Sequence, residues 1–461
     1  MSVRHLSFAS LLLIAGLIGA TAADLPPVPP VADQANLGVG IQRAMTLMAT
    51  STPEHRNKVK VLFYGQSITE QTWSKLVADD LKKRFPNADL EIANKAIGGF
   101  ASQRLVKVAE HDCYPWYPDL VIFHVYGANN TYEEIIKNIR TRTTAEVLMQ
   151  KDHVGANLPP VVKNWDEAKE LEKQDKGMWW DYMMNYVFLP DIAKKHGCGV
   201  ADVRTPWVKY LADNKLDTRA LLKDDIHLND DGCKVMAGIV SQYLVHRSDL
   251  PTDGWKDLVR DVPAKANGRT LTVAAEGNRF DVVVGTLDQP LSATVTIDGK
   301  KPSEFPECYA ITRVSPHAWS PLFIMRIDHS KPLVVEDWSL TLTSIAADAK
   351  SWKFAVKGSV TGDDGEGDSS QPFTSKSGRV VITPDSWFPS GAKIDNGFKI
   401  TWKVVPLFAD KIELKAGEAG KENLVTLAQG LPNEKHTIVL TAERDFSAAI
   451  TSIRAYKPPV K

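Results

Sequence analysis

Three residues of this chain have the types and spacing needed for nucleophilic catalysis by a hydroxyl group. Ser67 follows an apolar, β-branched run at residues 59–64, which is typical of a buried strand. A serine hydroxyl is a weak nucleophile until a base takes its proton, and the imidazole of His227 can act as that base. Asp224 lies three residues before His227, so its carboxylate can bend back to Nδ1 and leave Nε2 free for the serine. Asp225 lies only two residues before the histidine, a spacing that directs its side chain elsewhere.

Helix capping is the alternative interpretation of these positions. Ser67-Ile68-Thr69-Glu70 fits a capping box, in which the serine hydroxyl caps the start of a helix. Asn229 or Asp230 can cap the helix that follows His227. Capping therefore accounts for the serine and the asparagine, but not for the histidine.

Two further segments supply groups that can stabilise a negative charge. Gly127-Ala128-Asn129-Asn130 ends an apolar run at residues 120–126, and the side-chain amide of Asn129 can donate a hydrogen bond to an oxyanion there. Residues 94–99 follow a run at residues 90–93 and end in two glycines, where a backbone N–H can approach a ligand. An ordinary turn is the alternative, since glycine and asparagine dominate turns.

The elements that must position these residues alternate between strand and helix. Apolar runs indicate five strands, at residues 59–64, 90–93, 120–126, 146–150 and 199–203. Helical patterns separate them, an earlier helix is expected over residues 34–48, and residues 232–246 form the last helix. This alternation predicts a parallel sheet covered on both faces, with ligands bound beyond the carboxyl ends of the strands.

The order of these short blocks resembles the SGNH/GDSL hydrolase family. Gly-Gln-Ser follows the first strand, Asn-x-x-x-x-Gly the second and Gly-x-Asn the third, while Asp-x-x-His precedes the last helix, all within residues 58–247. The resemblance implies a flavodoxin-like three-layer α/β/α fold and ester hydrolysis through an acyl-enzyme. Gln66 stands where the family usually has Asp, as in some carbohydrate acetylesterases of this clan.

The site residues follow from the resemblance, motif by motif. Ser67 is the expected nucleophile and His227 its base, oriented by Asp224. The N–H of Gly99, the side chain of Asn129 and the N–H of the serine are expected to line the oxyanion hole.

The character of the sequence changes after about residue 250. From Leu271 onward, short alternating runs are separated by turn signals such as Asp298-Gly299, which is typical of an all-β sandwich or jelly roll. The remaining length fits one large β-module or two small ones. Within it, the acidic and glycine-rich residues 361–368 predict a mobile surface loop rather than a calcium site.

The first residues indicate export. A charged start, a short apolar run at residues 11–18 and small residues at 20–23 have the order of a signal peptide cut after Ala22 or Ala23. The run is short for a membrane anchor, so we expect a periplasmic or secreted protein. The expected organisation is then a signal peptide at 1–23, a leader at 24–57, the hydrolase domain at 58–250 and a β-region at 265–461.

Composition limits the partners. Lys and Arg total 55 against 56 Asp and Glu, and no basic run stands out, so neither nucleic acid nor an anionic membrane is an expected partner. No CxxC pair or HExxH motif occurs, so we expect no metal and no cofactor. Export permits disulfides, in any of three full pairings, among Cys113, Cys198, Cys233 and Cys308.

Two further groups lie at the expected ligand edge. His153 follows the fourth strand, where it either contacts substrate or is an ordinary loop residue. Trp165, Trp179 and Trp180 fall in the long connection that comes next, and they either form an aromatic wall over the site or pack onto the rest of the protein.

Export and the appended β-region favour an acylated carbohydrate as the substrate. We expect an esterase that removes a small acyl group, in particular an O-acetyl group, from a sugar or polysaccharide. A glycan-binding protein on a decayed hydrolase scaffold is one alternative, and it requires a broken triad. A carbohydrate O-acyltransferase is the other, and it needs an acyl donor.

Overall fold

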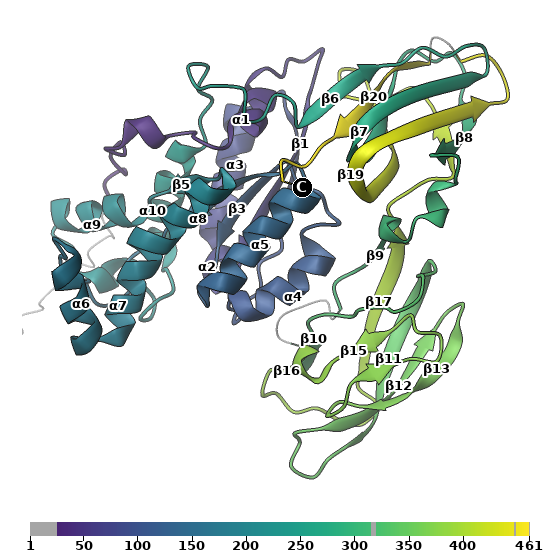
Figure 1. Cartoon of the computed structure of the whole chain (residues 1–461). Coiled ribbons are helices and arrows are strands. Elements are labelled where there is room, and N and C mark those ends of the chain that lie inside the picture. Colours follow the sequence, from purple (N-terminus) through teal and green to yellow (C-terminus); the bar gives the residue numbers. More distant parts are fainter. Residues whose placement is uncertain (1–24, 315–319, 447–448, 461) are drawn as a thin grey trace, which may run out of the picture.

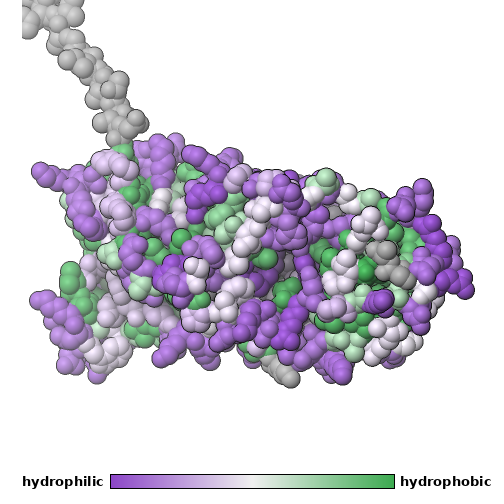
Figure 2. Space-filling view, turned by 90° about the horizontal axis from the view of Figure 1, so that it is seen from above, coloured by the Kyte–Doolittle hydropathy of each residue, from purple (hydrophilic) through white to green (hydrophobic). Residues whose placement is uncertain are grey.

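The computed structural model describes residues 25–314, 320–446 and 449–460, and it shows an α/β part followed by an all-β part (Figure 1). The expected signal peptide lies outside the described residues. Within these residues, no helix is both long enough and apolar enough to cross a membrane. Figure 2, which looks down on the upper face of Figure 1, shows hydrophilic residues over most of that face.

Five parallel strands form the sheet of the α/β part, in the order β2-β1-β3-β4-β5. Each strand corresponds to one of the apolar runs in the sequence. The strands are β1 (Lys58–Gly65), β2 (Asp89–Asn94), β3 (Leu120–His124), β4 (Glu146–Gln150) and β5 (Gly199–Ala201). This is the flavodoxin-like order, and the switch point lies between β1 and β3, where ligands bind at the carboxyl ends.

Helices cover both faces of this sheet because its strands are apolar on both faces. Val61 and Phe63 of β1 pack into one core, while Leu62 and Tyr64 pack into the other. The first core contains α1 (Gln42–Ala49), α3 (Thr72–Arg84), α9 (Arg204–Asp213) and α10 (Asp230–Tyr243). The second contains α4 (Ser102–Asp112), α5 (Asn129–Arg142) and α8 (Leu189–His196). The α/β fold class expected from the sequence is therefore confirmed.

The first helix is shorter than the sequence pattern predicts. A helix was expected over residues 34–48, but α1 begins only at Gln42. Gly38 and Gly40 both have φ of 76°, a left-handed conformation that interrupts a helix. The segment before them contains a single 3₁₀ turn, η1 (Gln34–Asn36).

The all-β part contains two larger sheets, and one is inserted into the other. The outer sheet has the order β18-β8-β19-β7-β20-β6, and the inserted sheet has the order β13-β12-β11-β17-β9. Each sheet has a hydrophobic core of its own. We call each sheet, with its core, a β-unit.

The strand bounds show how the chain leaves the outer sheet and returns to it. The outer sheet comprises β6 (Val259–Pro263), β7 (Thr270–Val284), β8 (Leu291–Ile297), β18 (Lys411–Leu414), β19 (Leu424–Ala442) and β20 (Ile450–Tyr456). The inserted sheet comprises β9 (Tyr309–Ile311), β11 (Glu336–Ile345), β12 (Trp352–Gly358), β13 (Gly362–Asp368) and β17 (Lys399–Pro406). Two small ribbons accompany it, one of β10 (Leu322–Ile324) with β16 (Trp387–Pro389) and one of β14 (Phe373–Thr374) with β15 (Val381–Ile382).

All but the first of residues 361–368 form strand β13 (Gly362–Asp368), so the prediction of a mobile loop is wrong. The acidic Asp364 is only 2% exposed, and its carboxylate accepts hydrogen bonds from the backbone N–H (2.8 Å) and hydroxyl (2.7 Å) of Ser377. A Cβ on Gly367 would lie 2.6 Å from the rings of both Phe354 and Phe373. Gly367 therefore lets two aromatic rings pack against the strand. The carboxylate of Asp364 is buried and hydrogen-bonded, whereas the composition suggests a carboxylate in contact with water.

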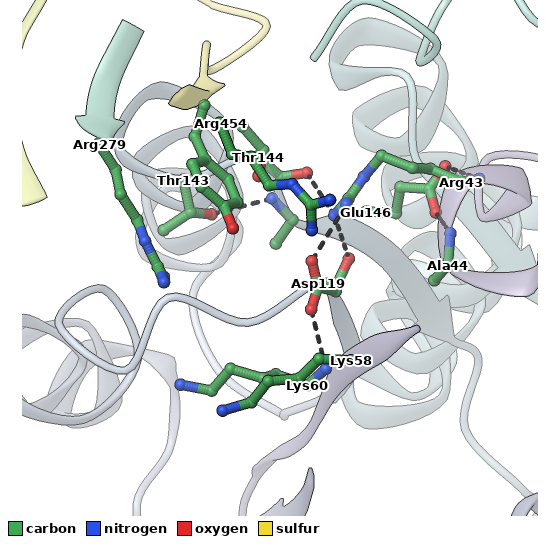
Figure 3. Close-up of polar contacts among 12 residues, drawn as sticks. Arg43, Ala44, Lys58, Lys60, Asp119, Thr143, Thr144, Glu146, Arg279 and Arg454 are labelled. Carbon is green, nitrogen blue, oxygen red and sulfur yellow. Dashed lines mark hydrogen bonds and ion pairs between the residues drawn. The ribbon is translucent and has the colours of Figure 1, made fainter. Parts of the chain in front are cut away.

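A polar cluster lies at the edge of the α/β sheet where the parallel strands begin, and Figure 3 shows Arg279 and Arg454 of the outer sheet near it. Asp119, just before β3, accepts hydrogen bonds from Arg43 Nη1 (3.0 Å) and Lys60 N (2.8 Å). Glu146 accepts from the backbone N–H groups of Arg43 (2.8 Å) and Ala44 (2.7 Å), and burial raises the pKa of its carboxyl to about 6. Asn278 of β7 accepts a hydrogen bond from the Tyr117 hydroxyl (2.7 Å) and donates one to Arg142 O (2.8 Å). The outer sheet therefore docks at the end of the α/β part opposite the carboxyl edge of its strands.

The inserted sheet instead reaches α4. Arg313 pairs with Asp112 of α4 and donates to Lys95 O (2.6 Å). Phe323 of β10 and Met325 lie within the second core of the α/β part. In Figure 1 the ribbon of β10 and β16 lies next to α4, at the lower end of the α/β part, which is the carboxyl edge of its strands. This β-unit therefore borders the candidate site.

The four cysteines are all described, buried and unpaired. Burial raises the pKa of the Cys198 thiol to about 11, so it is protonated at neutral pH. The structure therefore contains none of the disulfides that export would permit.

Candidate active site

Ser67 lies where β1 turns into the short helix α2 (Ser67–Glu70). A Cβ on Gly65 would lie 1.9 Å from the carbonyl oxygen of His124, so only glycine fits where β1 passes the end of β3. The cap residue of α2 is Gln66, which makes no side-chain cap, and the serine is the first helical residue. The Ser67 hydroxyl therefore does not form the capping box that the sequence allows, and its Oγ lies 2.9 Å from Nε2 of His227.

His227 and Asp224 lie in the loop before α10. The carboxylate of Asp224 lies 2.9 Å (Oδ2) and 3.2 Å (Oδ1) from Nδ1 of the histidine. Its Oδ1 also accepts hydrogen bonds from the backbone N–H groups of His227 (2.7 Å) and Ile226 (2.9 Å). These backbone bonds, followed by the imidazole contact, lower the pKa of Asp224 to about 2. The three side chains thus form a continuous chain of hydrogen bonds in which the carboxylate stays ionised.

Asp225 and Asn229 have other contacts. Asp225 forms an ion pair with Arg219 (2.8 Å) at the surface, and its side chain is 73% exposed. Asn229 caps α10 by accepting a hydrogen bond from Gly232 N (2.8 Å). The spacing argument that separated the two aspartates thus agrees with the positions of both.

Gln71 joins the serine segment to the histidine segment. It follows α2 directly, and its side-chain amide donates to Leu228 O (2.8 Å) while its Oε1 accepts from Leu228 N (3.0 Å). The residue after His227 is therefore held on both of its backbone groups. The sequence analysis missed this glutamine, because a polar residue at a helix start has no feature that indicates a contact 157 residues away.

His153 lies beneath the loop that carries His227. It is only 2% exposed, its ring packs against Trp207, and its Nε2 donates a hydrogen bond to Ile226 O (2.7 Å). Burial lowers the pKa of its imidazole to about 4, so the ring is neutral at physiological pH. This burial does not fit the direct substrate contact considered from the sequence. The side chain instead supports the backbone that carries His227.

The expected oxyanion residues Gly99 and Asn129 lie on two loops that are bonded to each other. Gly99 has φ of 76° and is an exposed residue of the otherwise mostly buried loop between β2 and α4, and Asn129 is the first residue of α5. The loops are joined at Ser102, whose N–H donates to Tyr126 O (2.8 Å) and whose hydroxyl donates to Ala128 O (2.9 Å).

Two glycines show how closely these loops approach their neighbours. A Cβ on Gly127 would lie 2.4 Å from the Ser102 hydroxyl oxygen, so the Asn129 loop requires a glycine there. A Cβ on Gly98 would lie 3.6 Å from Cβ of Ser67, which places the Gly99 loop beside the serine. Oδ1 of Asn129 is buried and accepts no hydrogen bond from a described residue.

A second buried network lies behind the site. His124, at the end of β3, pairs with Asp152 after β4, and Asn185 donates to Asp152 Oδ2 (3.1 Å). Asn185 belongs to a π-helical turn, η2 (Met184–Phe188), a rare element that is frequent at functional sites. This network anchors the long connection after β4, which includes α6 (Trp165–Gln174) and α7 (Lys176–Met183).

The arrangement brings a hydroxyl, an imidazole and a carboxylate into one chain of hydrogen bonds. Within residues 25–314, 320–446 and 449–460, no three His, Cys, Asp or Glu side chains are grouped so that they could hold a metal ion. Chemically, the arrangement can deprotonate the Ser67 hydroxyl and stabilise the imidazolium that results.

Comparisons with known proteins give similar solved structures but no family match. No protein-family model matches the chain, and no curated protein matches it. A two-domain esterase active on acetylated mannans, crystallized with mannopentaose, is 15% identical, with a TM-score of 0.36 over 92% of this chain and 96% of its own. An acetyl xylan esterase is 21% identical, with a TM-score of 0.32 over 40% of this chain and 98% of its own.

A catalytic mutant of an acetylxylan esterase from Geobacillus stearothermophilus is 16% identical, with a TM-score of 0.34 over 42% of this chain and 97% of its own. At similarities of this size, the fold assignment rests on the strand order and register, and the assignment of chemistry rests on the geometry around Ser67.

Proposed function

We propose that this protein is a serine esterase that removes small acyl groups, in particular O-acetyl groups, from carbohydrate. The observation that carries the proposal is the chain of hydrogen bonds from Ser67 Oγ to His227 Nε2 (2.9 Å) and from His227 Nδ1 to Asp224 (2.9 Å). Such a chain activates a hydroxyl for acyl transfer and has no evident structural purpose on an exposed loop. It also speaks against a decayed scaffold, because that alternative requires a broken triad.

The first half of the reaction forms an acyl-enzyme. Ser67 Oγ attacks the ester carbonyl carbon while Nε2 of His227 takes the hydroxyl proton, and Asp224 stabilises the imidazolium. The negative charge that develops on the carbonyl oxygen is stabilised by the N–H of Gly99 and the side-chain amide of Asn129. The C–O bond to the sugar then breaks, and the imidazolium gives its proton to the departing sugar hydroxyl.

The second half releases the acid. Water gives a proton to His227 and attacks the acyl carbon, and the bond to Ser67 Oγ breaks as that oxygen regains a proton. The products are the free serine and one carboxylic acid. An acyltransferase would follow the same steps with a second sugar hydroxyl in place of water, so the acceptor separates the two activities.

The exposure of the site supports a small acyl group on a bulky alcohol. The side chain of His227 is 33% exposed and that of Asp224 is 51% exposed, so the triad lies at the surface. An acyl chain of many carbons needs a deep apolar pocket to remove it from water, whereas an acetyl group does not. A polymer can approach an open site without threading through the protein.

The test is acetate release from acetylated mannan and acetylated xylan, compared with hydrolysis of p-nitrophenyl acetate and a long-chain ester. We expect release of acetate with little cleavage of the long-chain ester. Ser67→Ala and His227→Ala should each lower the rate by up to roughly a millionfold, because the two groups act as a unit. His329→Ala, which changes an exposed histidine of the β-part, is the matched control.

Three results would contradict the proposal. More than a few per cent of activity in either triad variant would exclude the assigned roles. A preference for long acyl chains would exclude the small-acyl assignment. Transfer of acetyl to an added sugar, in place of release to water, would make the protein an acyltransferase.

A further inference from the structure

Four aromatic rings form a continuous row on the connection after β4. Trp165 of α6 contacts Trp179 of α7 with 5.8 Å between ring centroids. Trp179 is followed by Tyr182 at 6.4 Å with nearly parallel planes, and Tyr182 by Tyr186 at 5.1 Å. In Figure 1, α6 and α7 project from the α/β part on the side away from the β-sheets.

The row lies on the solvent side of its helices. Trp179, Tyr182 and Tyr186 are spaced by three and four residues, which places them on one face of a helix. Met183 and Met184, which point the other way, are buried. Trp165 is 50% exposed and Tyr186 is 44% exposed, so the two ends of the row are open to water. Exposed aromatic side chains in such a series indicate a binding surface.

The surrounding charge disfavours an anionic partner. Residues 163–182 contain six Asp and Glu against four Lys, so this segment is acidic. Nucleic acid and anionic lipid both require the opposite sign. The row itself contains Trp and Tyr but no aliphatic side chain, which is an unusual composition for a surface that inserts into lipid.

We propose that this aromatic row binds the main chain of a neutral polysaccharide. The faces of a pyranose ring present C–H groups with a slight positive charge, and the faces of Trp and Tyr carry the complementary negative charge. A neutral sugar makes these contacts without requiring counter-charges, and its hydroxyl groups stay in water. This inference rests on the proposed function, since the row would hold the polymer whose acyl groups are removed at Ser67.

The row is connected to the candidate site by buried contacts. Asp181, between Trp179 and Tyr182, forms an ion pair with the buried Arg204. Arg204 donates to His153 O (3.4 Å), and the imidazole of His153 bonds to the backbone of the catalytic loop. The neighbouring Trp180 faces inward and lies 6.5 Å from Tyr126, which precedes the Asn129 loop. The helices therefore hold the row in a fixed position relative to the triad.

The experiment measures binding without turnover, in the full-length Ser67→Ala protein. The probes are deacetylated glucomannan and unsubstituted xylan oligosaccharides, titrated by calorimetry. Trp179→Ala combined with Tyr182→Ala should weaken binding about tenfold or more, because two stacking contacts are lost. Trp179→Phe and Tyr182→Phe keep the rings and should bind as the parent does.

Two controls separate the row from the general stability of the helices. Lys173→Ala removes an exposed side chain of α6 outside the row and should leave binding unchanged. Trp165→Ala changes only the exposed end of the row, so it serves where the double variant does not fold. It should weaken binding of long oligosaccharides more than that of short ones.

The outcomes distinguish this inference from the proposed function. Unchanged oligosaccharide affinity in folded ring-deleted variants would overturn the inference while leaving the esterase assignment intact. Binding of the row to phosphatidylcholine vesicles, lost in the same variants, would also overturn it in favour of a lipid surface. With Ser67 restored, the ring-deleted variants should hydrolyse p-nitrophenyl acetate normally and release acetate from polymer more slowly. An inactive wild type that still binds oligosaccharide through the row would refute only the esterase.

Discussion

At the scale of single residues, the orientation of His227 depends on a carboxylate with more than one partner. Asp224 accepts hydrogen bonds from two backbone N–H groups as well as from the imidazole, which lowers its pKa to about 2. A carboxyl whose pKa is lower in the folded state stabilises the fold above its unfolded pKa of about 4. That contribution is lost only as the pH falls toward 2. The carboxylate is therefore ionised and in place at every pH at which an esterase would be assayed.

Asp224→Asn should lower kcat by roughly 10⁴-fold, because the amide no longer holds the imidazole in the tautomer that leaves Nε2 free. Asp225→Asn is the matched control, since Asp225 is one residue away and pairs only with Arg219 at the surface. Its kcat should stay within about twofold of the wild type. Steady-state kinetics on p-nitrophenyl acetate provide the measurement. Equal losses in the two variants would show that the loop as a whole, rather than Asp224, supports the histidine.

The sequence was sufficient to predict that the side chains of Ser67, His227 and Asp224 lie together, but not which residues support them. A spacing of three residues before His227 limits where a carboxylate can lie, so the contact of Asp224 with the imidazole could be predicted before the structure. His153 could not, because a histidine after a strand can point to solvent or beneath the next loop, and only the packing of Trp207 decides. Gln71 bonds to a residue distant in the sequence, and no local pattern indicates such a pair.

At the scale of elements, the loop that carries Gly99 is held from outside by the inserted β-unit. Arg104 of α4 donates from Nη1 to Gly99 O (2.9 Å), and its guanidinium lies 4.2 Å from the ring centroid of Phe388 in β16. Phe100 packs edge-on against both Phe323 and Phe388, at 5.1 Å each. The Gly99 carbonyl and the Gly99 N–H lie in adjacent peptides that share the Gly99 Cα, so a fixed carbonyl limits rotation of this residue and with it the direction of its N–H. The inserted unit therefore contributes to the geometry expected of an oxyanion hole.

Arg104→Ala should lower kcat about 10- to 100-fold with little change in KM, because a small displacement of an oxyanion donor affects only the transition state. Lys107→Ala is the matched control. Lys107 also joins α4 to the inserted unit, through Asp385 (2.6 Å), but it does not contact the Gly99 loop. Affinity for a boronic acid that mimics the tetrahedral intermediate should fall in parallel with kcat in the first variant only. A loss of kcat shared by both variants would mean that docking of the β-unit, and not the bond to Gly99, is what matters.

The elements of the α/β part could be predicted more fully than those of the β-part. The central strands β1, β3 and β4 are mostly apolar runs buried on both faces, so length and composition are enough to find them, whereas the edge strand β2 is only partly buried. In the β-part, alternation predicts strands but not their partners. For example, β8 pairs with β18 and β19, which follow it in the sequence only after all the strands of the inserted sheet. Residues 361–368 show the same limit, because their strand depends on Ser377 and two phenylalanine rings from elsewhere.

At the scale of the whole molecule, a histidine lies at the junction of the α/β part and the inserted unit. His111 of α4 is 8% exposed and uses both ring nitrogens, with Nδ1–H donating to Ile311 O (3.1 Å) and Nε2 accepting from Ile327 N–H (3.2 Å). Only the neutral ring can make both bonds, because a second ring proton would face the N–H of Ile327. Burial, with a smaller effect of the nearby Arg326, lowers its pKa to about 4, although Ile311 O and the carboxylate of Asp328 oppose this shift.

The junction should therefore weaken in acid. In the unfolded chain a histidine binds its proton below about pH 6.5, whereas His111 in the folded protein does so only near pH 4. The unfolded state holds the extra proton between these values, so stability is complete above pH 6.5 and falls as the pH decreases toward 4. The loss should reach about 3 kcal/mol at pH 4 from this one group.

His111→Gln tests this linkage, because the amide can still donate and accept but does not titrate. The variant should be less stable than the wild type at pH 7, and the difference should shrink as the pH falls, since only the wild type loses the contribution of His111. His329→Gln, which changes an exposed histidine of the same β-unit, should follow the wild type at every pH. Urea denaturation at pH 7, 6 and 5 measures the free energies, and hydrogen exchange at Ile327 reports the junction directly. Parallel curves for the wild type and His111→Gln would show that the acid sensitivity arises elsewhere, for example at the buried His153, and that the junction does not depend on a neutral His111.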